Sequence, residues 1–209
     1  MKYLASIAIA AGTLAIAAPL QAQLFYIGLR GGAALPTGAF AEEGGTAEER
    51  LVSGAKTGFG YGLDAGINLG PIGIYAGFDK MKFECSEESC AAQESKYKLQ
   101  GVSAGVRLAV PLFPLVKPWV KAGVTFNELE AEFGSASSAT AFTSERTPGY
   151  EVGAGVDISL GPFFSLTPQV RYIGQKLDYK IPGVTSGDTS THAANYYTFD
   201  LGLRIRSPI

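Results

Sequence analysis

The chain alternates between apolar and polar or glycine positions with a period of two over most of its length. Between Thr57 and Leu69, for example, Phe59, Tyr61 and Leu63 alternate with glycines. Because successive side chains of a β-strand point to opposite faces, this pattern predicts strands with one apolar face each. The predicted strands are Leu24 to Ala33, Thr57 to Leu69, Ile72 to about Phe83, Tyr97 to Val110, Leu115 to about Phe133, Gly149 to Leu160, Phe163 to about Tyr179, and Tyr196 to Arg206.

The connections between these predicted strands alternate between long and short. An up-and-down antiparallel sheet would place the short turns on one rim and the long loops on the other. Eight is also the smallest number of strands that closes comfortably around side chains. The sequence therefore predicts an all-β fold, a closed up-and-down antiparallel eight-stranded barrel. The long loops are expected at Thr37 to Lys56, Cys85 to Lys96, Gly134 to Pro148, and Lys180 to Ala194.

The last predicted strand has one wholly apolar face. Left unpaired, it would be an exposed edge, and such an edge invites association with other chains. We therefore predict that it pairs with the first strand, Leu24 to Ala33, and closes the barrel. Its apolar face consists of Tyr197, Phe199, Leu201, Leu203 and Ile205.

Composition decides which face points outward. The chain contains 27 Gly in 209 residues, and the polar face of the strands is mostly glycine interrupted by single charges. Such a mixture suits the crowded interior of a narrow barrel, where glycine leaves room for long side chains and opposite charges neutralise each other. The predicted interior charges are Arg30, Asp64, Asp79, Arg107, Lys121, Glu151, Asp157, Arg171, Asp200 and Arg204.

The apolar face carries no charge across the middle of the strands. A Lys or Arg facing hydrocarbon there would cost about 2 to 4 kcal/mol, so this face is predicted to contact lipid. Two alternatives remain open at this stage. A soluble lipocalin-like barrel would turn the apolar face inward, but its outer surface would need far more Lys and Glu. The interior charges favour a satisfied ion-pair network, with a proton relay or a pore as the alternative.

The first residues predict export. Lys2 precedes an apolar run from Tyr3 to Ala18, and the small residue Ala22 follows. This order is typical of a secretory signal peptide, predicted over residues 1–22, with the barrel domain over residues 23–209. An uncleaved membrane anchor is the alternative. Because exported proteins meet oxidising conditions, Cys85 and Cys90 are expected to form a disulfide.

Together, the signal peptide, the eight amphipathic strands and the motifs GFGYGLDAGINLG, YEVGAGVDISLG and YTFDLGLRIR resemble the small outer-membrane β-barrel family of OmpA-like, OmpX-like and opacity-type proteins. The resemblance implies insertion into a Gram-negative outer membrane by the barrel-assembly machinery, with periplasmic termini and long loops outside the cell. Many family members end on an aromatic residue, whereas this chain ends Ser207-Pro208-Ile209. Tyr197, Phe199 and Leu201 are the expected substitutes for that assembly signal.

Candidate chemistry is sparse. His192 is the only histidine, and Ser190 and Thr191 precede it. Lipid A deacylases with this barrel type use a His-Ser-Glu arrangement, but His192 falls in a predicted Gly/Ser/Thr loop. We therefore predict no catalytic residue, no metal site and no cofactor. A formal charge of −2 without a basic block also argues against nucleic acid as a partner.

The expected function is structural, or is an interaction at the cell surface through four long loops of a monomeric barrel. Outer-membrane lipid and lipopolysaccharide are the expected partners, together with a host or surface ligand. The first two loops are acidic, so they also suggest bridging to lipopolysaccharide through divalent cations. The alternatives are a lipid A-modifying enzyme and a narrow conduit for small solutes or hydrophobic molecules.

Overall fold

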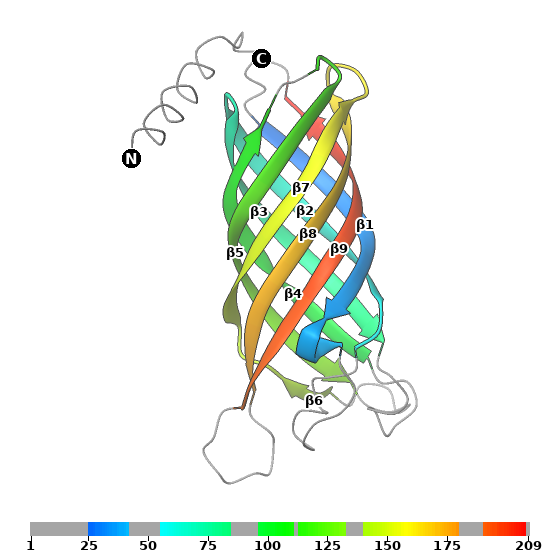
Figure 1. The fold of residues 1–209 in the computed structure, drawn as a ribbon, viewed down its shortest axis with the longest axis vertical. Helices are drawn as coiled ribbons and strands as arrows, with labels where there is room; N and C mark the ends of the chain where they lie inside the picture. Colours follow the sequence, from blue (N-terminus) through cyan, green and yellow to red (C-terminus); the bar gives the residue numbers. More distant parts are fainter. Residues whose placement is uncertain are drawn as a thin grey trace, which may run out of the picture.

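The computed structural model describes residues 25–41, 55–84, 96–110, 113–132, 140–179 and 190–207, almost all of them in strands (Figure 1). The expected signal peptide, Cys85, Cys90 and most of the long loops lie outside these ranges. One short 3-10 helix, η1, covers Gly38–Phe40. The strands are β1 (Phe25–Thr37), β2 (Gly58–Leu69), β3 (Ile72–Glu84), β4 (Lys96–Ala109), β5 (Val116–Glu132), β6 (Thr140–Thr143), β7 (Thr147–Ser159), β8 (Phe164–Tyr179) and β9 (Ser190–Arg206).

Eight long strands form a closed antiparallel barrel. Leu29 of β1 lies opposite Leu63 of β2 on one side and opposite Leu203 of β9 on the other. The pairing between β4 and β5 completes the circle, so each of these strands has two neighbours. The predicted fold, including closure by the first and last strands, is confirmed. The short strand β6 pairs with β5 alone and is not part of the barrel wall.

The barrel has two different ends. The short connections, the start of β1 and the finish of β9 lie at one end, which we call the turn end (Figure 1). The long connections leave from the opposite end, the loop end. Gly70 and Gly161 have φ of 73° and 109°, a backbone conformation that favours glycine and permits the tight turns. Within the described ranges, no helix is long and apolar enough to cross a membrane.

Several strands extend further toward the loop end than predicted. The segment from Gly134 to Pro148 was expected to be a loop, but it contains β6 and the start of β7. The loop ending at Ala194 is likewise too long, because β9 begins at Ser190, opposite Tyr179 of β8. Backbone pairing continues there through residues that lack the apolar alternation, so the sequence pattern did not mark them.

The polarity of the two faces is exchanged part of the way along the strands. On the outward face of β3, apolar residues end at Phe78, and Lys80 and Lys82 follow. On its inward face, Met81 and Phe83 are buried. The sequence shows the same exchange, because its apolar alternation changes face beyond Lys80. This suggests that the strand has left its apolar surroundings there. The register is continuous, and each side chain keeps its face while the chemistry of the faces is exchanged.

Candidate functional site

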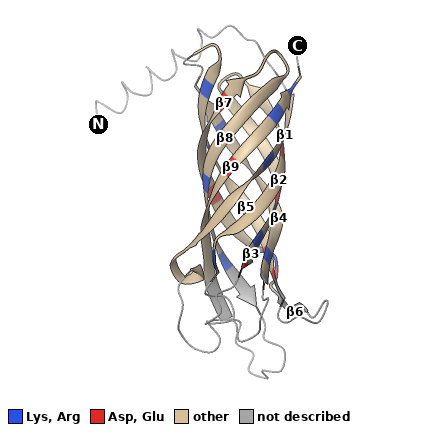
Figure 2. Ribbon diagram, turned by 90° about the vertical axis from the view of Figure 1, so that its right-hand side faces the viewer, with Lys and Arg blue, Asp and Glu red and all other residues tan. Residues whose placement is uncertain are grey.

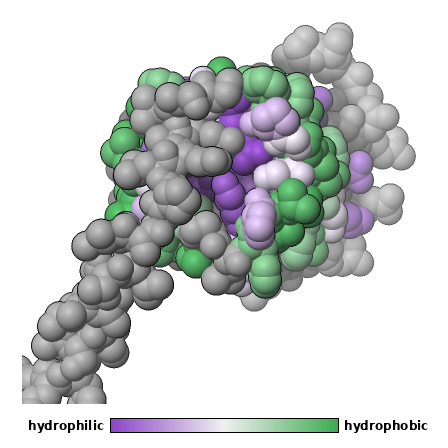
Figure 3. Space-filling model, turned by 90° about the horizontal axis from the view of Figure 1, so that it is seen from above, coloured by the Kyte–Doolittle hydropathy of each residue, from purple (hydrophilic) through white to green (hydrophobic). Residues whose placement is uncertain are grey.

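The interior of the barrel is the most developed polar site of the described structure. The structure places all ten predicted interior charges on the inward face, where eight are buried and Asp64 and Asp79 are half-buried. Seen from the turn end, hydrophilic side chains fill the mouth of the barrel and hydrophobic ones form its outer wall (Figure 3). Charged positions of both signs are spread along the strands and are not gathered at one end (Figure 2). The strand alternation alone directs these side chains inward.

Asp157 is the centre of the network near the turn end. Its carboxylate accepts hydrogen bonds from Arg107 Nη2 at 2.6 Å, Arg204 Nη1 at 2.9 Å and Trp119 Nε1 at 3.1 Å. Two aromatic rings cover the guanidinium groups. Arg107 lies 4.5 Å from the centroid of Trp119, and Arg204 lies 4.2 Å from the centroid of Tyr26. The two arginines are therefore held by ion pairs and by cation–π contacts.

Asp64 and Asp79 join this group to the middle of the barrel. Arg204 Nη2 lies 3.4 Å from Asp64, whose other carboxylate oxygen accepts a 2.7 Å bond from Arg30 Nη1. Arg30 Nη2 also donates to Asp79 at 2.8 Å. Asp79 in turn pairs with Arg171, 3.1 Å away. Asp64 thus lies between Arg30 and Arg204, and Asp79 lies between Arg30 and Arg171. Each carboxylate therefore has two arginine partners.

Arg171 is the centre of the network toward the loop end. Its Nε donates to Asp200 at 2.9 Å, and its Nη1 lies 3.4 Å from Glu151. Glu151 also pairs with Lys121 at 3.2 Å and accepts a 2.7 Å hydrogen bond from the Tyr75 hydroxyl. All ten charges therefore belong to one connected set of ion pairs, five basic and five acidic.

Glycines make room for the aromatic members of this network. A Cβ at Gly123 would lie 2.5 Å from the Tyr75 hydroxyl, and one at Gly66 would lie 2.6 Å from the Tyr26 ring. Tyr26, Tyr75 and Trp119 were not among the predicted site residues. The signal that could have identified them is their position in the alternating pattern, because all three share the inward face of their strands with the predicted charges.

A small void lies within the network. A void of about 10 Å³ lies among Tyr26, Arg30, Trp119 and their neighbours, which is about the room that one water molecule needs. Within the described parts of the chain, no three His, Cys, Asp or Glu side chains are grouped so that they could hold a metal ion. The charges bind one another, and the void between them is too small for a ligand larger than water.

A second, apolar filling occupies the lumen at the loop end. The rings of Phe40 and Phe83 meet edge to face at 5.2 Å, and Phe83 and Tyr196 meet at 5.5 Å. The side chain of Tyr97 is also fully buried here. The sequence placed Phe40 in a long loop, Thr37 to Lys56, whereas the structure buries its side chain in this cluster. The cluster comprises Ala34, Phe40, Ala55, Met81, Phe83, Tyr97, Leu99, Leu129, Ile173, Ala194 and Tyr196.

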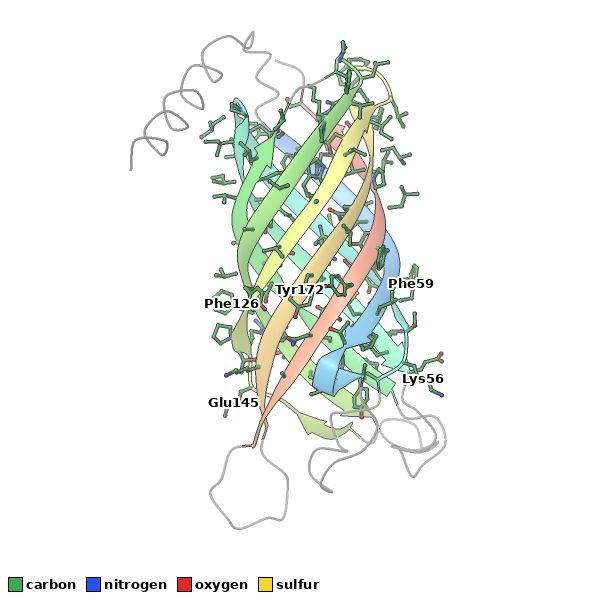
Figure 4. The ribbon with its side chains drawn as sticks, viewed as in Figure 1. Lys56, Phe59, Phe126, Glu145 and Tyr172 are labelled. Carbon is green, nitrogen blue, oxygen red and sulfur yellow. The ribbon has the colours of Figure 1, made fainter. Side chains whose placement is uncertain are left out.

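The outer surface carries an apolar belt that ends in a row of aromatic side chains. Phe59, Phe126 and Tyr172 point outward at a similar height, and Lys56 and Glu145 lie beyond them toward the loop end (Figure 4). Aromatic residues are enriched at such levels because their rings suit the boundary between hydrocarbon and water. The predicted lipid-facing residues of β9 are all exposed on this belt, namely Tyr197, Phe199, Leu201, Leu203 and Ile205.

The remaining sequence candidates are His192, Cys85 and Cys90. His192 lies in β9 opposite Leu177, so its predicted loop position is wrong. Its side chain lies outside the described part of the structure, as do Cys85 and Cys90. The sequence alternation anticipated the charged interior, but it did not anticipate the apolar filling at the loop end.

Comparison with known proteins gives the same architecture. The family described as "Outer membrane protein beta-barrel domain" matches residues 6–206. Neisserial surface protein A superposes with a TM-score of 0.61 at 17% identity, covering 88% of this chain and 97% of the other. OprG from Pseudomonas aeruginosa gives 0.53 at 12% identity, covering 90% and 98%. A major outer membrane protein from Thermus thermophilus gives 0.52 at 13%, covering 88% and 99%. No curated protein sequence matches the chain.

Proposed function

The chain belongs to the outer membrane protein β-barrel domain family, and from that premise we propose that it acts at the cell surface through its four long connections, with the barrel as a sealed anchor. The observation that carries the proposal is the filled lumen. The ion-pair network occupies the middle and the turn end, and the apolar cluster occupies the loop end. A barrel closed in this way serves to hold the segments that leave it.

The interior charges support a structural role over a catalytic one or a pore. Each of the ten predicted interior charges has an ion-pair partner within 3.4 Å. Removing one member of a buried pair leaves the other uncompensated, so the network resists opening. A side chain whose charge is already matched is poorly placed to attack or deprotonate a substrate. The proposal therefore includes neither a conduit nor an enzyme.

Planar bilayer recording tests the sealed lumen. Purified protein, folded in detergent and inserted into a bilayer, should produce no conductance steps, because buried ion pairs and a buried apolar cluster occupy the described lumen. A known porin in the same bilayer is the positive control. Regular conductance steps from this protein that are absent after heat denaturation would show that the barrel is a conduit and would contradict the proposed sealed anchor.

The surface role needs a separate measurement. Cells displaying the protein should adhere to cultured epithelial cells or to immobilised matrix glycans more than cells with an empty vector. Replacing the long connections by short hairpins should remove this gain. The barrel itself should remain folded, as judged by different gel migration with and without boiling. Equal adherence of all three strains would contradict the proposed surface role.

A further inference from the structure

A pair of outward lysines marks the first charged position beyond the apolar belt on one side of the barrel. Lys80 and Lys82 follow Phe78 on the outward face of β3. In the register, Lys80 lies between Tyr61 of β2 and Gln100 of β4. Lys82 lies between Phe59 and Lys98. The two ammonium groups are therefore bordered by exposed aromatic rings on one side.

The charges around this pair do not neutralise it. Among the described residues, neither Lys80 nor Lys82 has an ion-pair partner. Glu84, the next outward residue of β3, lies further from the belt. On β5, Glu128 is engaged, because it pairs with Arg146 at 3.2 Å and accepts a bond from Gln100 Nε2 at 2.7 Å.

Lys82 of β3 also lies directly opposite Lys98 of β4, so two positive charges face each other across the strands. Like charges that face each other across two strands are destabilising unless something compensates them. Lys98 also lies opposite Glu130 on its other side, whereas Lys82 lies opposite the ring of Phe59. The uncompensated charge is thus on β3, beside the aromatic surface.

We propose that Lys80 and Lys82 bind the phosphate group of an outer-leaflet glycolipid, whose acyl chains lie against Phe59 and Tyr61. The rings are 66% and 56% exposed, so they offer a wide apolar surface immediately beside the ammonium groups. A lysine stem lies along an apolar surface while its head reaches the polar layer, which suits this height. The combined apolar and cationic surface favours a phosphorylated lipid over free phosphate.

The test uses the folded full-length protein in mixed micelles. Bis-phosphorylated lipid A and the same lipid after enzymatic removal of its phosphates are titrated separately, and retained lipid is counted by native mass spectrometry. The unaltered protein should retain the phosphorylated form and not the dephosphorylated one. The double variant K80Q/K82Q should bind the phosphorylated lipid roughly 30-fold more weakly, as expected for two basic groups at a membrane surface.

Two variants control for charge and position. K80R/K82R keeps both charges and should retain the lipid. K176Q removes an exposed lysine of β8, outside the proposed site, and should bind like the unaltered protein. Equal retention of both lipid forms, or unchanged binding by K80Q/K82Q, would overturn the proposal. A difference in gel migration before and after boiling, equal to that of the unaltered protein, establishes that each variant is folded, so a loss of binding reports on the site.

Discussion

At the scale of single residues, Arg171 is the most heavily used side chain of the interior. Its guanidinium contacts Asp79, Glu151 and Asp200 and is almost wholly shielded from solvent. A planar group with five donors can serve several carboxylates at once, which an ammonium group cannot do in the same geometry. Three strands are therefore joined to β8 through one residue.

Replacement of Arg171 by Met should lower the free energy of unfolding by about 3 to 5 kcal/mol, because buried carboxylates lose their partner. Urea titration of the protein folded in lipid vesicles measures this loss. Arg146→Met is the matched control, since its ion pair with Glu128 is solvent-exposed and should contribute about 1 kcal/mol or less. Equal losses in the two variants would contradict the central role of Arg171.

At the scale of strands, β3 shows how one element serves two surroundings. Its turn-end half presents apolar residues to lipid and polar ones to the lumen. Its loop-end half presents Lys80 and Lys82 outward and buries Met81 and Phe83. The loop-end half thus has the arrangement of a soluble barrel, which indicates that the wall continues beyond the hydrocarbon layer.

Single cysteines on β3 should locate this boundary. In a C85S/C90S background, Lys82→Cys should react with a membrane-impermeant maleimide on intact cells, and Ala76→Cys should not, since lipid covers it. The extent of labelling is read by the gel shift of a polymer-linked reagent. The background protein without added cysteine should stay unlabelled. Labelling at position 76 would indicate that water, and not lipid, surrounds the apolar belt.

At the scale of the whole molecule, the antiparallel pairing of β1 and β9 removes the last free edge. The pairing runs from Tyr26 opposite Arg206 to Thr37 opposite Asn195, so residues from the two ends of the domain share one seam. Closure satisfies the backbone groups of both strands, which lipid cannot do. The barrel consequently behaves as one cooperative unit.

The closed barrel should migrate differently on a gel before and after boiling in detergent. Removal of residues 196–209 should abolish this difference, because β1 and β8 would each lose a partner along most of their membrane-facing length. Circular dichroism of both proteins gives the strand content independently. A full-length protein whose migration is the same with and without boiling would not fit a closed barrel.

The sequence by itself determined the eight barrel strands, their connectivity and the direction of the interior charges, but not β6 or how far the strands extend toward the loop end. A period of two determines which side chains share a face, so the sequence alone assigned Arg30 and Asp200 to the lumen. It also placed Phe59 and Tyr61 on the opposite face from Gly60, the glycine between them. These properties are local, because each depends only on the residue's place in its own strand.

Only the tertiary structure decided which of these side chains meet. Asp79 and Arg171 are 92 positions apart, and Asp64 and Arg204 are 140 apart, so the register of the closed sheet brings them together. The same holds for the apolar cluster, where Phe40 meets Phe83 across the lumen. Alternation within one strand does not say where a residue lies along the barrel axis, because the strands are tilted and their register is set by pairing. Inward residues touch only when they lie at the same level along that axis.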